Sequence, residues 1–129
     1  MVDFYELGDF IAKNIFMEKT ILDGIEIPLV FLVEKPKDIL NAESYIVYSF
    51  REIDGGKTLR HYEVEISINC KNIKDIFQIR QNIINDLDFY NRPCSLGYQK
   101  MILANEGGIY LDEISGYHRD KFFFDVKRK

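Results

Sequence analysis

The most constraining feature of the sequence is a pair of long strand patterns joined by a glycine turn. Residues 58–70 alternate between apolar and polar side chains, and residues 45–53 precede them across an Asp-Gly-Gly turn at 54–56. Alternation with a period of two places one face of a strand in the core and the other toward water. The pair therefore predicts a long β-hairpin, and the apolar face of its second strand comprises Tyr62, Val64, Ile66, Ile68 and Cys70. Both strands are longer than about five or six residues, so their ends are expected to project beyond the sheet.

Two segments on either side of the hairpin have the spacing of amphipathic helices. The first opens at Asp3, which forms a capping box with Glu6, and its apolar stripe is Phe4, Leu7, Ile11 and Ile15, with Phe10 beside them. The second is capped by Asn72, and its expected apolar face is Ile73, Ile76, Phe77, Ile83, Ile84 and Leu87. Arg80 interrupts this face, and we expect its stem to pack while its charge reaches water.

Further strand patterns lie before and after these elements. The apolar run 27–33 follows a turn signal at Asp23-Gly24, and it predicts one strand, either buried on both faces or at an edge near Pro28. Residues 100–104 and 109–114 are also expected to be strands. The segment 120–127 alternates, with Phe122, Phe124 and Val126 on one side. Phe123 shares the other side with charged residues, so either a further layer covers that face or Phe123 meets a partner.

This order of elements predicts an α+β fold: a mainly antiparallel twisted sheet with a long β-hairpin and two helices packed on one face. No linker, repeat or low-complexity segment divides the chain, so a single domain over residues 1–129 is expected. The net charge of −4 argues against a general nucleic-acid binder. Cys70 and Cys94 lack C-x-x-C spacing, and no apolar run approaches the roughly 20 residues of a membrane span, so a cytoplasmic chain with reduced thiols is expected.

The sequence contains no recognisable catalytic or metal-binding motif. His118-Arg119-Asp120 matches the start of a kinase catalytic loop, but the required asparagine and glycine-rich loop are missing. His61 and His118 lack the spacing of zinc ligands. Glu63 and Glu65 share a strand face and could flank a substrate, yet no base is placed to act with them. We therefore expect no catalytic residues, no cofactor and no metal, and we interpret the chain as a protein other than an enzyme.

Several segments together resemble the tail-terminator or tail-completion proteins of tailed phages, prophages and phage-tail-like bacteriocins. They are the helix opening at Asp3, the hairpin strands 45–48 and 62–68 with their glycine turn, the helix 72–87, and the closing strand 122–126 after Tyr117-His118-Arg119-Asp120. The resemblance covers nearly the whole chain. It implies a structural protein that forms a ring, usually a hexamer, on the end of a tail tube. Such a ring ends tube growth and joins the tube to the neck or collar.

The resemblance also implies partners and a location. The partners would be further copies of the chain, the tail tube, and sheath or neck and collar proteins, with no sequence-specific nucleic acid and no membrane. The protein would occupy the bacterial cytoplasm during assembly and then the virion or tail-like particle. From face and position we expect the following residues to meet partners: Tyr48, Phe50, Arg51, His61, Phe123, Lys127, Arg128 and Lys129. Two alternatives stay open, a head-tail neck or head-completion protein, and a small α+β enzyme or ligand-binding domain.

Overall fold

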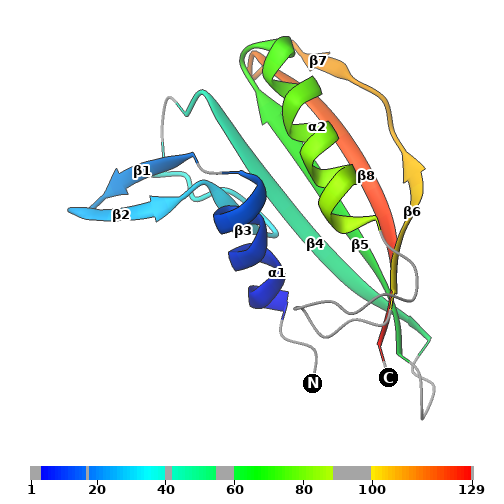
Figure 1. Ribbon diagram of the computed structural model, residues 1–129. Helices are drawn as coiled ribbons and strands as arrows, with labels where there is room; N and C mark the ends of the chain where they lie inside the picture. Colours follow the sequence, from blue (N-terminus) through cyan, green and yellow to red (C-terminus); the bar gives the residue numbers. More distant parts are fainter. Residues whose placement is uncertain (1–3, 17, 40–41, 55–59, 89–99, 129) are drawn as a thin grey trace.

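The computed structural model describes residues 4–16, 18–39, 42–54, 60–88 and 100–128 (Figure 1). The N-terminal elements are α1 (Phe4–Phe10), the π-helical turn η1 (Ile11–Ile15), β1 (Lys19–Leu22), β2 (Ile25–Pro28) and β3 (Val30–Leu32). The others are β4 (Ser44–Asp54), β5 (Arg60–Cys70), α2 (Ile73–Leu87), β6 (Lys100–Glu106), β7 (Tyr110–Asp112) and β8 (Tyr117–Arg128). None of the described helices is long and apolar enough to cross a membrane.

The main sheet has the strand order β3-β4-β5-β8-β6, and β7 also pairs with β8. The predicted hairpin is confirmed as β4 and β5, which pair from Ser44 opposite Cys70 to Asp54 opposite His61. All pairings are antiparallel except that of β3 with β4. Both helices lie on the same side of the sheet in Figure 1. The expected α+β fold, with a mainly antiparallel sheet and helices on one face, is therefore correct.

The core lies between the helices and the sheet face that alternation predicted to be apolar. Ile66 and Phe122 pair across β5 and β8 and are both fully buried. From α2 the core receives Ile76, Ile79, Ile83 and Leu87. The predicted helix face was partly wrong, because Ile73 and Phe77 are 41% and 54% exposed. The buried positions follow an i, i+3, i+7, i+11 spacing, which places these two side chains on a flank of the helix.

The first helix packs against the hairpin through the predicted stripe. Leu7, Ile11 and Ile15 are buried, whereas Asp3 lies outside the described residues. A β-carbon on Gly8 would lie 2.9 Å from Cε1 of Tyr48 and closer still to its hydroxyl. Glycine at position 8 therefore allows the helix backbone to approach the sheet, at the expense of helix propensity.

The apolar run 27–33 is divided into two strands, which corrects the single strand expected there. Pro28 ends β2, and it lacks the N–H needed to continue a ladder. At Leu29 the chain changes partner, because the Leu29 amide donates to Glu18 (2.9 Å) while its carbonyl accepts from Ile46 (2.9 Å). β2 pairs instead with β1, a strand that the sequence patterns missed, across the predicted Asp23-Gly24 turn. These two strands form a separate hairpin, called the arm below, which leaves the body at the left of Figure 1.

The open edge of β6 is capped by the end of α2. The helix stops at Leu87, and the carboxylate of the next residue, Asp88, accepts a hydrogen bond from the Leu103 amide at 3.1 Å. The Tyr90 to Pro93 segment, expected to end this helix, lies outside the described residues. The strands predicted over 100–104 and 109–114 correspond to β6 and the shorter β7, and both pair with β8.

Val33 has a backbone conformation that β-branched residues rarely adopt, with φ of 74°. Its amide donates to the Tyr48 carbonyl, and its side chain is 68% exposed. We expect Val33→Gly to stabilise the protein by roughly 0.5–1 kcal/mol, because relief of left-handed strain exceeds the entropy of glycine in the unfolded chain. Urea unfolding measures the change. Ile21→Gly, in the regularly paired strand β1, is the control and should destabilise; a loss at both positions would contradict the prediction.

Candidate interaction surfaces

The sheet face opposite the helices carries a network of ion pairs, and no described element covers it (Figure 1). Arg51 of β4 lies 3.3 Å from Glu63 of β5, and Lys121 of β8 lies 3.4 Å from Glu65 of β5. Phe123 stands opposite Glu65 and is half-buried among these charges. The face thus combines one aromatic ring with ion pairs that link neighbouring strands.

Four of the residues predicted to meet partners, Arg51, His61, Phe123 and Lys127, share this open face by strand alternation. His61 Nε2 lies 3.3 Å from Asp125 Oδ1 on the same face. The side chain of Arg128 and the whole of Lys129 lie outside the described part of the chain.

Two residues predicted to meet partners lie on the opposite side of the sheet, because even-numbered positions of β4 point toward the helices. Tyr48 is only 3% exposed beneath α1, so it belongs to the core and its assignment to a partner surface was wrong. Phe50 is 42% exposed on the helix side of the sheet. The predicted partner surface therefore combined residues from opposite faces of β4.

Glu63 and Glu65 do not form the acid–base pair that an enzyme would require. Each is paired with a cation, Arg51 and Lys121 respectively, and each remains partly accessible to water. They line an open hollow together with Ser49 and Arg51 of the same face. Both carboxylates therefore take part in the ion-pair network of the open face.

The one fully buried acid that the structure describes, Asp120, was not singled out from the sequence. It lies under α2, with Arg80 Nε 3.8 Å from its Oδ2 and the same guanidinium 2.8 Å from Glu106. Burial raises the pKa of Asp120, while Arg80 and the Lys121 amide act in the opposite direction. The expectation that the Arg80 charge reaches water was thus incomplete. Its position on an apolar helix face, and the alternation of Asp120 with Phe122, were the available signals.

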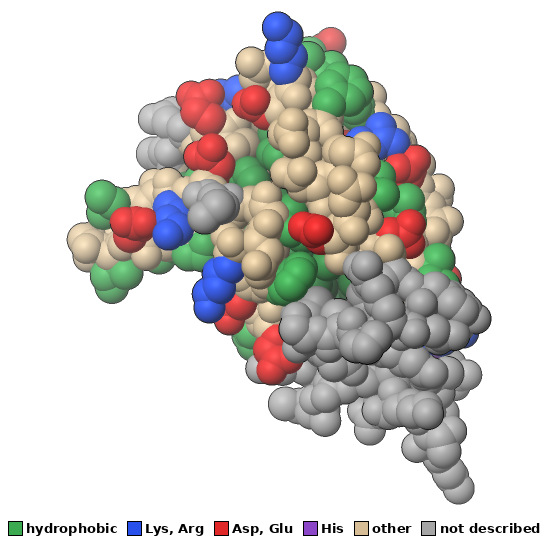
Figure 2. Space-filling view, in the orientation of Figure 1, with side chains coloured by type: hydrophobic (Ala, Val, Ile, Leu, Met, Phe, Trp, Pro, Cys, Tyr) green, Lys and Arg blue, Asp and Glu red, His purple; other side chains and the backbone are tan. Residues whose placement is uncertain are grey.

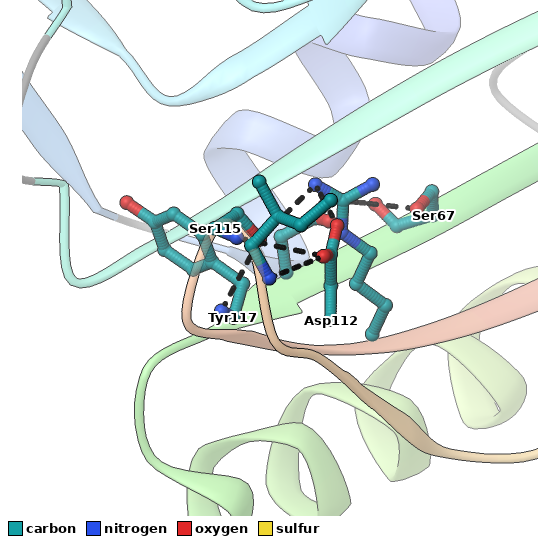
Figure 3. Close-up of polar contacts among 7 residues, drawn as sticks. Ser67, Asp112, Ser115 and Tyr117 are labelled. Carbon is teal, nitrogen blue, oxygen red and sulfur yellow. Dashed lines mark hydrogen bonds and ion pairs between the residues drawn. The ribbon is translucent and has the colours of Figure 1, made fainter.

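The turn between β7 and β8 is organised by one carboxylate (Figure 3). Asp112 accepts hydrogen bonds from the Ile114 amide (3.0 Å) and the Ser115 amide (3.4 Å), and it lies 3.3 Å from Arg119. Burial would raise the pKa of Asp112, but these two amides and the guanidinium outweigh it and lower the pKa. Tyr117 follows the turn, and its hydroxyl donates to the Ala42 carbonyl at 2.6 Å. These contacts fix the turn and have a structural role.

The arm is the second candidate surface, and it projects from the body with apolar side chains at its end. Ile21 and Ile25 are 73% and 65% exposed. Figure 2 shows hydrophobic atoms on both sides of the projecting arm. A groove separates the arm from the first helix and is lined by Asp9, Ala12, Lys13, Lys19, Glu26 and Pro28.

Neither cysteine nor metal chemistry is evident among the described residues. Burial raises the pKa of Cys70 to about 12, with Asp75 and Glu18 contributing, so its thiol stays protonated at neutral pH and is a poor nucleophile. No three His, Cys, Asp or Glu side chains in the described ranges come close enough to bind a metal ion. Compared with protein-family models and with curated protein sequences, the chain matches none.

Proposed function

We propose that the protein is a structural subunit that assembles as a ring on the end of a phage-like tail tube. The ring ends tube growth and joins the tube to the neck or collar. The observation that carries this proposal is the arm, which projects from the domain in Figure 1 and whose Ile21 and Ile25 are exposed. Large apolar side chains at the end of a projecting hairpin are suited to contact with a neighbouring subunit.

The open sheet face supports the same function. It carries Phe123 among ion pairs in which each cation is matched by an anion, as Arg51 is by Glu63. Such a face can meet a protein surface without concentrating charge of one sign. DNA passing through a ring lumen would also meet no strongly basic wall, in keeping with the net charge of −4. The subunit would be made in the bacterial cytoplasm and end in a virion or tail-like particle.

Tail tubes provide the direct test. We expect the purified protein, added to tail tubes polymerised from a phage tail-tube protein of the same genome, to form rings at tube ends and to shorten the length distribution in electron micrographs. Tubes grown without the protein are the control. Native mass spectrometry at micromolar concentration should reveal the ring or its precursors. Tubes of unchanged length with bare ends would contradict the proposal, and binding to portal rings instead would favour the neck protein.

A further inference from the structure

A hollow of about 320 Å³, called the helix-side hollow below, lies between η1 and the first two turns of α2. Figure 1 shows these two elements on the same side of the sheet. Its apolar wall consists of Ile15, Phe16 and Ile79, which are all buried and so held in place by the core. The Phe16 amide donates to the Ile11 carbonyl at 2.8 Å, which is the hydrogen bond of a π-helical turn. Such turns are rare and occur frequently at functional sites.

Two carboxylates line the same hollow, Glu18 just before β1 and Asp75 in the first turn of α2. Both side chains are exposed, and neither forms an ion pair with another residue in the described part of the chain. Burial, followed by Asp75 and Glu18, raises the pKa of the Cys70 thiol to about 12. Cys70 stands opposite Ser44 across β4 and β5. Both negative charges therefore act on the same end of the hairpin.

A buried hydroxyl also opens into the helix-side hollow. Ser44 is only 4% exposed, and it lies on the helix side of β4, as Ile46 and Tyr48 do. Its hydroxyl forms no hydrogen bond with any residue that the structure describes, although Ser44 lines the hollow. Polar side chains that are almost wholly buried usually have a hydrogen-bond partner. Ser44 therefore points to an occupant of the hollow, independently of the two carboxylates.

The remaining polar group of the hollow is a further acceptor. Gln78 donates from Nε2 to Asn82 Oδ1 at 3.3 Å, which leaves its Oε1 oxygen available to the hollow. The described lining thus offers two carboxylates, an amide oxygen and a hydroxyl, and it contains no lysine or arginine. Calcium takes about six to eight oxygen ligands, whereas one wall here is apolar. This combination suits an organic cation with an apolar part.

We infer that the helix-side hollow binds a primary alkylammonium group, with the ammonium at Glu18, Asp75 and Ser44 and the alkyl chain along the apolar wall. An ammonium has three donors and no acceptor, which matches a lining of acceptors. The methylene groups gain by leaving water for the apolar wall. A free diamine and a lysine side chain of another protein both carry this group. The inference does not depend on the proposed ring, because neither the end of the arm nor the open sheet face takes part.

Titration of the protein with n-butylammonium, followed by amide chemical shifts in NMR spectra, tests the site. We expect saturable shifts at Glu18, Ser44 and Asp75, with a dissociation constant on the order of 1–10 mM. Two ligands of similar shape are the controls, because 1-butanol lacks the charge and butyltrimethylammonium lacks the N–H donors. Each should bind at least about tenfold more weakly. No saturation up to about 20 mM, or equal affinity for all three ligands, would overturn the inference.

Substitutions that keep side-chain size locate the bound ammonium. Glu18→Gln and Asp75→Asn should each weaken n-butylammonium binding by about threefold, as expected for exposed ion pairs. Asp23→Asn is the matched control, because it removes the same charge at the exposed turn of the arm, where asparagine tolerates the φ of 52°. Its affinity should be unchanged, and circular dichroism verifies that all three variants fold. An equal loss from Asp23→Asn, or no loss from the other two, would show general attraction and overturn the inference.

Two further ligands identify the source of the ammonium. They are 1,5-diaminopentane and a lysine whose backbone amine and carboxyl group are both blocked. Binding of the blocked lysine as tightly as n-butylammonium would identify a lysine of another protein as the occupant. Tight binding of the diamine alone would identify a free amine, and either result supports the ammonium site. Failure of every amine would refute the site and leave the proposed function intact, since tail tubes test that function separately.

Discussion

Replacing Arg80 by alanine is expected to lower the free energy of unfolding by about 2–4 kcal/mol at neutral pH, because it leaves Asp120 as a buried carboxylate without its cation. Asp120 is fully buried, and Arg80 both approaches it and binds Glu106 at 2.8 Å. The guanidinium also lies over the Phe122 ring, 5.7 Å from its centre, so the substitution removes packing as well as charge. Urea unfolding monitored by circular dichroism measures the loss.

The pH dependence of this loss identifies its cause. The folded-state pKa of Asp120 is raised above its ordinary value of 3.8, so Asp120 contributes its full stability below that pH and loses it as the pH rises. The deficit of the Arg80→Ala variant should therefore shrink as the pH is lowered from neutral toward the ordinary value of 3.8, because Asp120 takes up a proton. Asp120→Asn should restore most of the stability in the Arg80→Ala background.

Lys121→Ala is the matched control for Arg80→Ala, because it removes a cation from the exposed pair with Glu65. Its expected cost is below about 1 kcal/mol. Equal losses at positions 80 and 121, or a deficit at position 80 that does not vary with pH, would show that Asp120 does not depend on Arg80.

Gly8→Ala should destabilise the protein by about 1–3 kcal/mol, as overpacked cores do, although the same change in a free helix stabilises it. The new β-carbon would be 2.9 Å from Cε1 of Tyr48, and that ring is only 3% exposed. Because the ring is enclosed by the core, either the ring or the whole helix must move. Thermal and urea unfolding both detect the effect.

The sign of the Gly8 effect should reverse when the ring is absent. In a Tyr48→Ala background, Gly8→Ala meets no ring, and helix propensity should stabilise the protein by up to about 1 kcal/mol. A double-mutant cycle over these two positions isolates the contact from the cost of losing the tyrosine. Stabilisation by Gly8→Ala in both backgrounds would mean that the helix does not approach β4 at this glycine.

The central strands could be predicted from the sequence because their two faces meet different environments. In β5 and β8 every second residue contacts the helices, so Val64 and Phe124 are apolar while Glu63 and Asp125 are not. The run 27–33 gave no such signal, since an apolar side chain suits both the arm and the sheet edge. The division at Leu29 depends on its hydrogen bonds to Glu18 and Ile46. Both partners lie in other segments of the chain, so a local sequence pattern cannot reveal them.

The candidate surfaces could be predicted only in part, for a related reason. Alternation placed Arg51 and Phe123 on the open face, but it cannot say which face of a strand a helix will cover, so Tyr48 was assigned to the surface. On α2 the choice between Ile79 and Phe77 for the core depends on how the helix is rotated over β5 and β8. In that orientation Arg80 pairs with Glu106 and Asp120, and pairings across the fold have no local sequence signature.

The hydrogen bond from the Leu103 amide to the Asp88 carboxylate affects how the strand edge behaves at high protein concentration. An unpaired strand edge is a template for indefinite addition of further strands, and this hazard grows with protein concentration. With Asp88 occupying the amide at 3.1 Å, an incoming strand must displace a charged acceptor and leave it without a partner. Growth by sheet extension is thereby disfavoured at Leu103, which leaves side-chain surfaces as the place where this edge of the protein can meet others.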